Sequence, residues 1–166
     1  MREILFRGFH PYDGPDTILV DGEKVKGRWV KGNLVHAQED ESFIPVTYIF
    51  PDFVTAKYNP TTKEIIMHGG VDVLPSTVGQ YTGIDSIYVS LNAPAGSQKI
   101  FTGDVLCGIK KEEIGVVTYW ELYGGYVLVG KNGLPNDFTH KLIANAGNWG
   151  HLFNRGTVFD VDESVD

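Results

Sequence analysis

The sequence predicts a mainly β protein of short antiparallel strands, and three observations support this fold class. Alternating apolar and polar residues recur along the chain in runs rich in β-branched and aromatic side chains. Turn-forming Gly, Pro, Asn and Asp residues separate these runs, with 20 glycines and 8 prolines in 166 residues. Segments with a helical period are few. The chain is long enough for one domain, or for two small subdomains.

The first strands are predicted on both sides of a tight turn. Asp21-Gly22 stands between "TILV" and "EKVKGRWV", and this dipeptide favours a hairpin because glycine readily adopts a positive φ. The following run "GRWVKGNLVHA" alternates as a strand does. It places Val30 and Leu34 on one face, with Trp29 on the other.

Two more strands complete the first half. "FIPVTYIF" places Ile44, Val46, Tyr48 and Phe50 on one face of a strand. "TTKEIIMHGG" reads as a turn followed by a short strand, which the two glycines end.

The second half is predicted to form a meander of hairpins. "GVVTYWELYGGYVLVG" contains two apolar runs around Gly124-Gly125, and Lys131 to Gly133 supplies a further turn. Lys110 to Glu113 is a charged connector. "DFTHKLIANAG" fits a strand over Lys141 to Asn145, or a short helix capped by Asp137.

The loop "SLNAPAGSQ", residues 90–98, is the predicted boundary between two subdomains. Residues 1–89 would form an N-terminal β subdomain, and residues 99–159 a subdomain with an SH3-like barrel. Residues 160–166 would be an acidic tail that contributes little to stability.

Composition indicates a soluble, cytoplasmic protein. No apolar run approaches the ~20 residues of a membrane helix. The start "MREILFRGF" has charges within its short apolar run, whereas a secretion signal needs a longer uncharged core and a small-residue cleavage site. The single cysteine, Cys107, cannot form an internal disulfide, as suits a reducing compartment.

The charge disfavours nucleic acid as a partner without excluding it. The formal net charge is −7, whereas nucleic-acid binding depends on clustered cations that neutralise phosphates. The densest basic group is Lys24, Lys26, Arg28 and Lys31 in the predicted hairpin. We interpret these residues as a solvated strand face, and they are the candidates if nucleic acid binds.

Four segments resemble the YopX family, whose members are small proteins encoded by phages and prophages of Gram-positive bacteria. They are "MREILFRGF", "GRWVKGNLV", "TVGQYTG" and "KIFTGDV", in that order. The resemblance implies a mainly β fold with an SH3-like C-terminal part, made in the cytoplasm of a bacterial host. It implies no catalytic residues. The connection from Gly83 to Lys99 is longer than is usual in the family, and the C-terminal segment matches only loosely.

No motif of catalysis, metal binding or cofactor binding is found. Phosphate-binding, dinucleotide-binding and hydrolase motifs are absent, and the five histidines are scattered. His36 with Glu39 and Asp40 comes nearest to a metal-ligand group, but the three lie in an acidic loop. Cys107, within "DVLCGI", fits a small core residue better than a nucleophile. We therefore expect a protein that is not an enzyme and needs no cofactor.

The candidate site lies in "STVGQYTG" and "KIFTGDVLCG", which contain Gln80, Tyr81, Phe101 and Asp104. Our preferred interpretation is structural. Tyr81 and Phe101 would be buried where the two halves meet, Gln80 would form a hydrogen bond there, and Asp104 would accept bonds from turn amides. The neighbouring glycines, Gly79, Gly83 and Gly103, would meet backbone needs. The alternative is a surface groove in which Gln80, Tyr81 and Phe101 contact a ligand.

The function expected from the sequence is that of a phage or prophage accessory protein that binds a host or phage protein, or itself as a homo-oligomer. Short strands leave open sheet edges, which natural proteins often cover by association. Three Trp and eight Tyr also exceed what a small core hides. A nucleic-acid-binding SH3-like module is the alternative.

Overall fold

The computed structural model describes residues 4–38, 45–51, 55–86, 98–108, 113–135 and 153–160. It is mainly β, which confirms the predicted fold class, and the helical segments of these residues are two 3-10 turns. No helix in these ranges is long and apolar enough to cross a membrane. The chain forms two compact units, the N-terminal unit Ile4–Val78 and the C-terminal unit from Gly79 onward.

This division falls inside the "TVGQYTG" segment, between Val78 and Gly79, whereas the sequence predicted it at residues 90–98. The reason is strand pairing, because the strand that begins at Gly79 pairs with the strand that ends at Phe101. The candidate residues of both motif segments, Gln80, Tyr81, Phe101 and Asp104, therefore belong to the same unit. Residues 87–97 lie outside the described residues.

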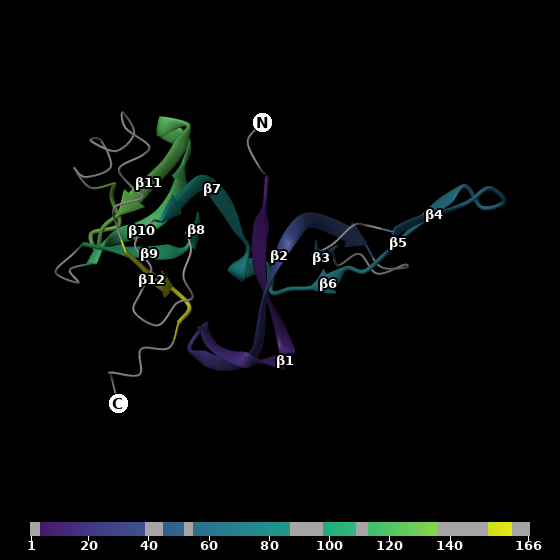
Figure 1. Cartoon of the computed structure of the whole chain (residues 1–166), viewed down its shortest axis with the longest axis horizontal. Helices are drawn as coiled ribbons and strands as arrows, with labels where there is room; N and C mark the ends of the chain where they lie inside the picture. The colour runs from purple at the N-terminus through teal and green to yellow at the C-terminus, as the bar shows by residue number, and fades with distance from the viewer. Residues whose placement is uncertain are drawn as a thin grey trace. The chain divides into compact units, whose positions relative to one another are not determined.

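The N-terminal unit is organised around a long antiparallel hairpin of β1 (Phe6–Val20) and β2 (Glu23–Gln38), shown in Figure 1. Asp21 and Gly22 form its turn with φ of 50° and 82°, as predicted. β3 (Pro45–Phe50) pairs with β2, and the two-residue β6 (Val71–Asp72) pairs with β3. A 3-10 turn, η1 (Pro75–Thr77), ends the unit.

The core of this unit contains Val30, Ile49 and Val73, with Leu34 packed against them. The predicted face of β2 with Val30 and Leu34 is thus the core face. On β3 the predicted apolar face includes Phe50, which is buried. The fully buried residue of β3 is Ile49, however, and it lies on the opposite face.

Strands β4 (Thr55–Asn59) and β5 (Glu64–His68) pair only with each other among the described residues. The side-chain oxygen of Asn59 accepts hydrogen bonds from the backbone N–H groups of Thr61 and Thr62. These bonds stabilise the turn between β4 and β5. Every side chain of β5 is exposed. The predicted short strand is present, but its apolar residues are not in a core.

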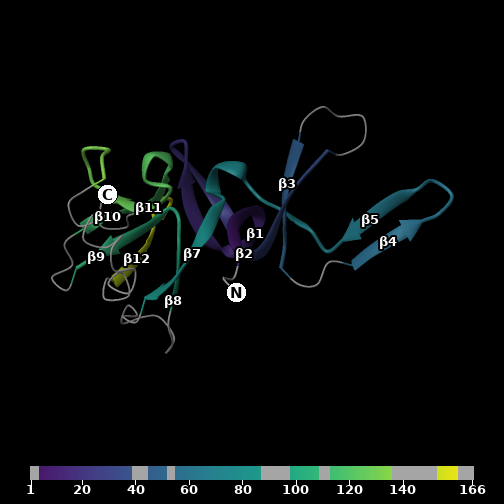
Figure 2. The same ribbon diagram turned by 90° about the horizontal axis from the view of Figure 1, so that it is seen from above.

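The C-terminal unit contains a strand pair and a four-stranded sheet, seen in Figure 2. β7 (Gly79–Ser86) pairs with β8 (Gln98–Phe101). The sheet has the order β11-β10-β9-β12. Its strands are β9 (Asp104–Cys107), β10 (Glu113–Trp120), β11 (Gly125–Val129) and β12 (Phe153–Thr157).

The predicted hairpin at Gly124-Gly125 is β10 and β11, joined by the 3-10 turn η2 (Glu121–Tyr123). The predicted turn over Lys131 to Gly133 is also present. The described strands form an open sheet and no closed barrel, so the SH3-like barrel is not confirmed. The segment Lys141 to Asn145 lies outside the described residues.

The core of the C-terminal unit takes one residue from each of four strands, which links the strand pair to the sheet. They are Ile100, Leu106, Val117 and Leu128. Cys107 is also buried, as expected of a core residue.

Candidate functional site

Tyr81 and Phe101 face each other across the β7–β8 pair. They are register partners, and their ring centroids lie 5.7 Å apart at an interplanar angle of 47°. Tyr81 is 6% exposed and Phe101 is fully buried, which confirms the predicted burial. The Lys99 ammonium lies 4.4 Å from the centroid of the Tyr81 ring, close enough for a cation–π contact. Both residues belong to the C-terminal unit, and their rings contact each other there.

Gln80 is tied to the same corner through its backbone. Its N–H donates to the Thr102 hydroxyl at 2.9 Å, and its carbonyl accepts from the Thr102 N–H at 2.9 Å. Its side chain is half-buried. These bonds join β7 to the turn after β8.

Asp104 is the fully buried carboxylate of this corner. Its Oδ2 accepts from the backbone N–H of Phe101 at 2.8 Å, so the predicted bond to a turn amide is present. The same oxygen accepts from the side-chain amide of Asn154 on β12, also at 2.8 Å. A buried carboxylate is stable only when it is hydrogen-bonded, and these donors supply that need. Asp104 thereby links the β8–β9 turn to the last strand of the sheet.

The glycines beside these residues meet backbone needs, as predicted. A Cβ on Gly79 would lie 2.5 Å from the carbonyl oxygen of Thr102, so only glycine allows this close approach. Gly83 has a φ of 85° where the β7–β8 register shifts, and Gly103 has a φ of 88° in the turn.

The four candidate residues therefore do come together, but as one packed and hydrogen-bonded corner. Because Tyr81, Phe101 and Asp104 are buried, they offer little surface to a ligand. The groove alternative is not favoured by this arrangement. The corner's observable role is to hold β7, β8, β9 and β12 together.

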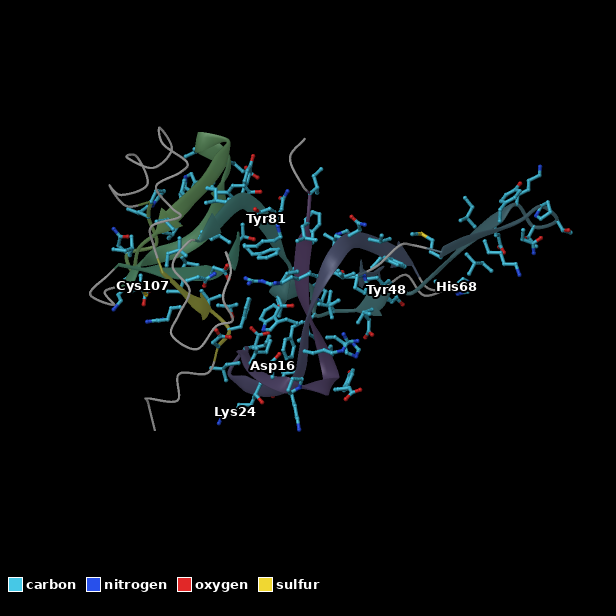
Figure 3. All side chains as sticks on the ribbon, viewed as in Figure 1. Asp16, Lys24, Tyr48, His68, Tyr81 and Cys107 are labelled. Atoms are coloured by element: carbon cyan, nitrogen blue, oxygen red, sulfur yellow. The ribbon has the colours of Figure 1, made fainter. Side chains whose placement is uncertain are left out.

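The basic candidates divide between two faces of β2. Lys24, Lys26 and Arg28 are exposed at alternate positions and thus share one face, with Lys24 labelled in Figure 3. Their register partners on β1 are Leu19, Thr17 and His10. Lys31 is exposed but lies at an odd position, on the opposite face. Only three of the four predicted residues form a common basic stripe.

The sequence offered His36 with Glu39 and Asp40 as its nearest approach to a metal-ligand group, without predicting a metal there. No group of three or more His, Cys, Asp or Glu side chains suited to a metal is found in these ranges. The His36 imidazole lies 3.2 Å from the Thr47 hydroxyl, and Glu39 and Asp40 are outside the described residues.

The surface that sequence reasoning missed is the β4–β5 hairpin. Tyr58, Ile65, Ile66 and Met67 are between 43% and 66% exposed, and side chains extend from both faces of the ribbon in Figure 3. The run "IIM" could have indicated this, because neighbouring residues of a strand face opposite sides. At least one of these three apolar side chains had to leave any one-sided core.

Comparison of the chain with family models, curated proteins and solved structures finds no match. The resemblance of its four segments to the YopX family therefore stays a prediction.

Proposed function

We propose that this protein is a non-enzymatic accessory protein of a phage or prophage, acting in the bacterial cytoplasm by binding protein surfaces, a second copy of itself first among them. The observation that carries the proposal is the exposed apolar surface of the β4–β5 hairpin. Burial of an Ile or Met side chain contributes about 1.5–3 kcal/mol, so covering this surface favours association.

The exposed tyrosines support the same conclusion. Tyr12, Tyr58 and Tyr119 are each more than half exposed, and tyrosine is enriched at protein interfaces. Tyr12 also has a φ of 87°, an uncommon conformation for a residue other than glycine, at the bulge of β1.

Sedimentation velocity of the whole chain over a range of micromolar concentrations tests the proposal. We expect the weight-average mass to rise above that of the monomer, 18.4 kDa, as concentration increases. A monomer at every concentration would contradict self-association.

Nucleic-acid binding is the second candidate, and the stripe of Lys24, Lys26 and Arg28 favours it. These three cations share an exposed face whose β1 partners are not acidic. Fluorescence anisotropy with labelled single- and double-stranded oligonucleotides at low salt tests it. Binding that weakens steeply with salt, and that is lost when all three cations become Ala, would support this function. No change in anisotropy at low salt would remove it.

A further inference from the structure

The two faces of the β4–β5 hairpin differ in polarity. Tyr58 pairs with Ile65, and Met67 follows two positions along β5, so these three exposed side chains share an uncharged face. The other face contains Glu64, Ile66 and His68 of β5, with Lys57 opposite Ile66. The hairpin is thus amphipathic, yet both faces are exposed.

The backbone of the hairpin has the same need of a partner. β4 is the single strand neighbour of β5 among the described residues, so the other edge of β5 has no strand beside it there. An isolated two-stranded hairpin is at best marginally stable in water, and three or more strands are needed for independent stability. An apolar edge strand is also a template for pairing with another chain.

The sequence of β5 is complementary to itself in the antiparallel direction. If two copies pair along their full five residues, the two-fold axis passes through the middle residue, Ile66. Ile66 then meets Ile66 of the second copy, and Ile65 meets Met67. Glu64 meets His68, so a carboxylate acceptor stands opposite an imidazole N–H donor at both ends of the interface.

We propose that the β5 edge is a homodimerisation site, at which two copies join in a four-stranded sheet of order β4-β5-β5-β4. This inference rests on the proposed function and names its surface and partner. The pairing places Ile65 and Met67 of both copies, with both Tyr58 rings, on one face of a continuous sheet. It also supplies the neighbouring strands that the isolated hairpin lacks.

The β4 edge does not offer the same complementarity. Its middle residue is Lys57, so the equivalent two-fold pairing would place two like charges directly opposite each other. Pairing of a β4 edge with a β5 edge is heterologous and would continue into open filaments. Only β5 with β5 gives a closed and complementary pair.

The interface is small, which sets the expected strength. Stable protein–protein interfaces bury about 1,200–2,000 Å², more than a five-residue edge provides. We therefore expect a dimer that forms reversibly and depends on concentration.

The first experiment compares the whole wild-type chain with Ile66→Glu by sedimentation velocity at matched concentrations. The variant brings two Glu side chains together on the axis, and the dimer should be lost. Leu122→Glu is the matched control, because Leu122 is an exposed aliphatic residue of η2 in the other unit, and the dimer should persist. Because Ile66 is exposed and its partner within the hairpin is Lys57, Glu is accommodated there, and circular dichroism should show the same fold for all three proteins.

The second experiment tests the register. Glu64→Lys should weaken the dimer by placing Lys opposite His68, and the double variant Glu64→Lys/His68→Glu should restore it. Within one chain Glu64 pairs with Asn59, and His68 with Thr55, so rescue requires contact between copies. Under mild oxidation Ile66→Cys should form a covalent dimer, whereas Lys57→Cys on the other edge of the same hairpin should not.

These outcomes separate the inference from the function on which it rests. A wild-type dimer that survives Ile66→Glu, or a Glu64 variant that is not rescued, overturns the β5 interface while leaving self-association standing. A wild-type protein that stays monomeric overturns both. Species that grow beyond a dimer would indicate the heterologous pairing and overturn the closed one.

Discussion

The side-chain amide of Asn154 donates a 2.8 Å hydrogen bond to Oδ2 of Asp104, a residue 50 positions earlier in the chain. The same oxygen accepts from the backbone N–H of Phe101. One buried carboxylate thus joins the turn after β8 to the final strand of the sheet.

Asp104→Ala should lower the free energy of unfolding by about 2–4 kcal/mol, because it leaves two buried donors without their charged acceptor. Chemical denaturation measures the change. Asp13→Ala removes an exposed carboxylate and serves as the control, with an expected change within about 0.5 kcal/mol. Equal effects of the two substitutions would contradict the linking role of Asp104.

Tyr81→Ala and Phe101→Ala should each cost about 3–5 kcal/mol, a large share of the ~5–15 kcal/mol that stabilises a domain. We expect poorly folded protein, as judged by near-ultraviolet circular dichroism and thermal denaturation. Tyr58→Ala is the matched control, since that ring is exposed. If either buried aromatic could be removed with an unchanged melting curve, the surface-groove interpretation would regain support.

Gly83→Val should destabilise the fold by roughly 1–3 kcal/mol, because a β-branched residue is strongly disfavoured at a φ of 85°. Gly83→Asn should cost less, since asparagine tolerates the left-handed region. The melting temperatures should therefore rank wild type, Asn, then Val. A Val variant as stable as the Asn variant would show that φ does not constrain this position.

Asp160→Ala should lower stability by about 1 kcal/mol. The sequence placed Asp160 in an acidic tail that contributes little to stability. In the structure its carboxylate accepts hydrogen bonds from the backbone N–H of Thr157 at 2.7 Å and from the Thr157 hydroxyl at 3.1 Å. A truncation that starts at Val161 keeps these bonds, whereas one that starts at Asp160 removes them. Thermal denaturation of both truncations distinguishes the two starting points, and identical melting curves would show that these bonds add nothing.

Local chemistry was enough to predict several of the strands, the hairpin turns and the role of the glycines, whereas β4, β6 and β12 were not predicted. The Asp21-Gly22 hairpin, the Gly124-Gly125 hairpin and the positive φ of Gly83 depend on residues a few positions apart, and such preferences are visible in the sequence. The bond from Phe101 to Asp104 is local in the same sense, because it spans three residues.

Relationships between distant residues were decided only by the tertiary structure. Asn154 could not be identified as the partner of Asp104, because strand order brings β12 beside β9 across 50 residues. Alternation likewise shows that a strand has two faces without showing which of them is covered. For this reason the sequence predicted β5 as an ordinary strand. Its apolar side chains were recognised as an exposed surface only from the fold, because no strand other than β4 lies beside β5 among the described residues.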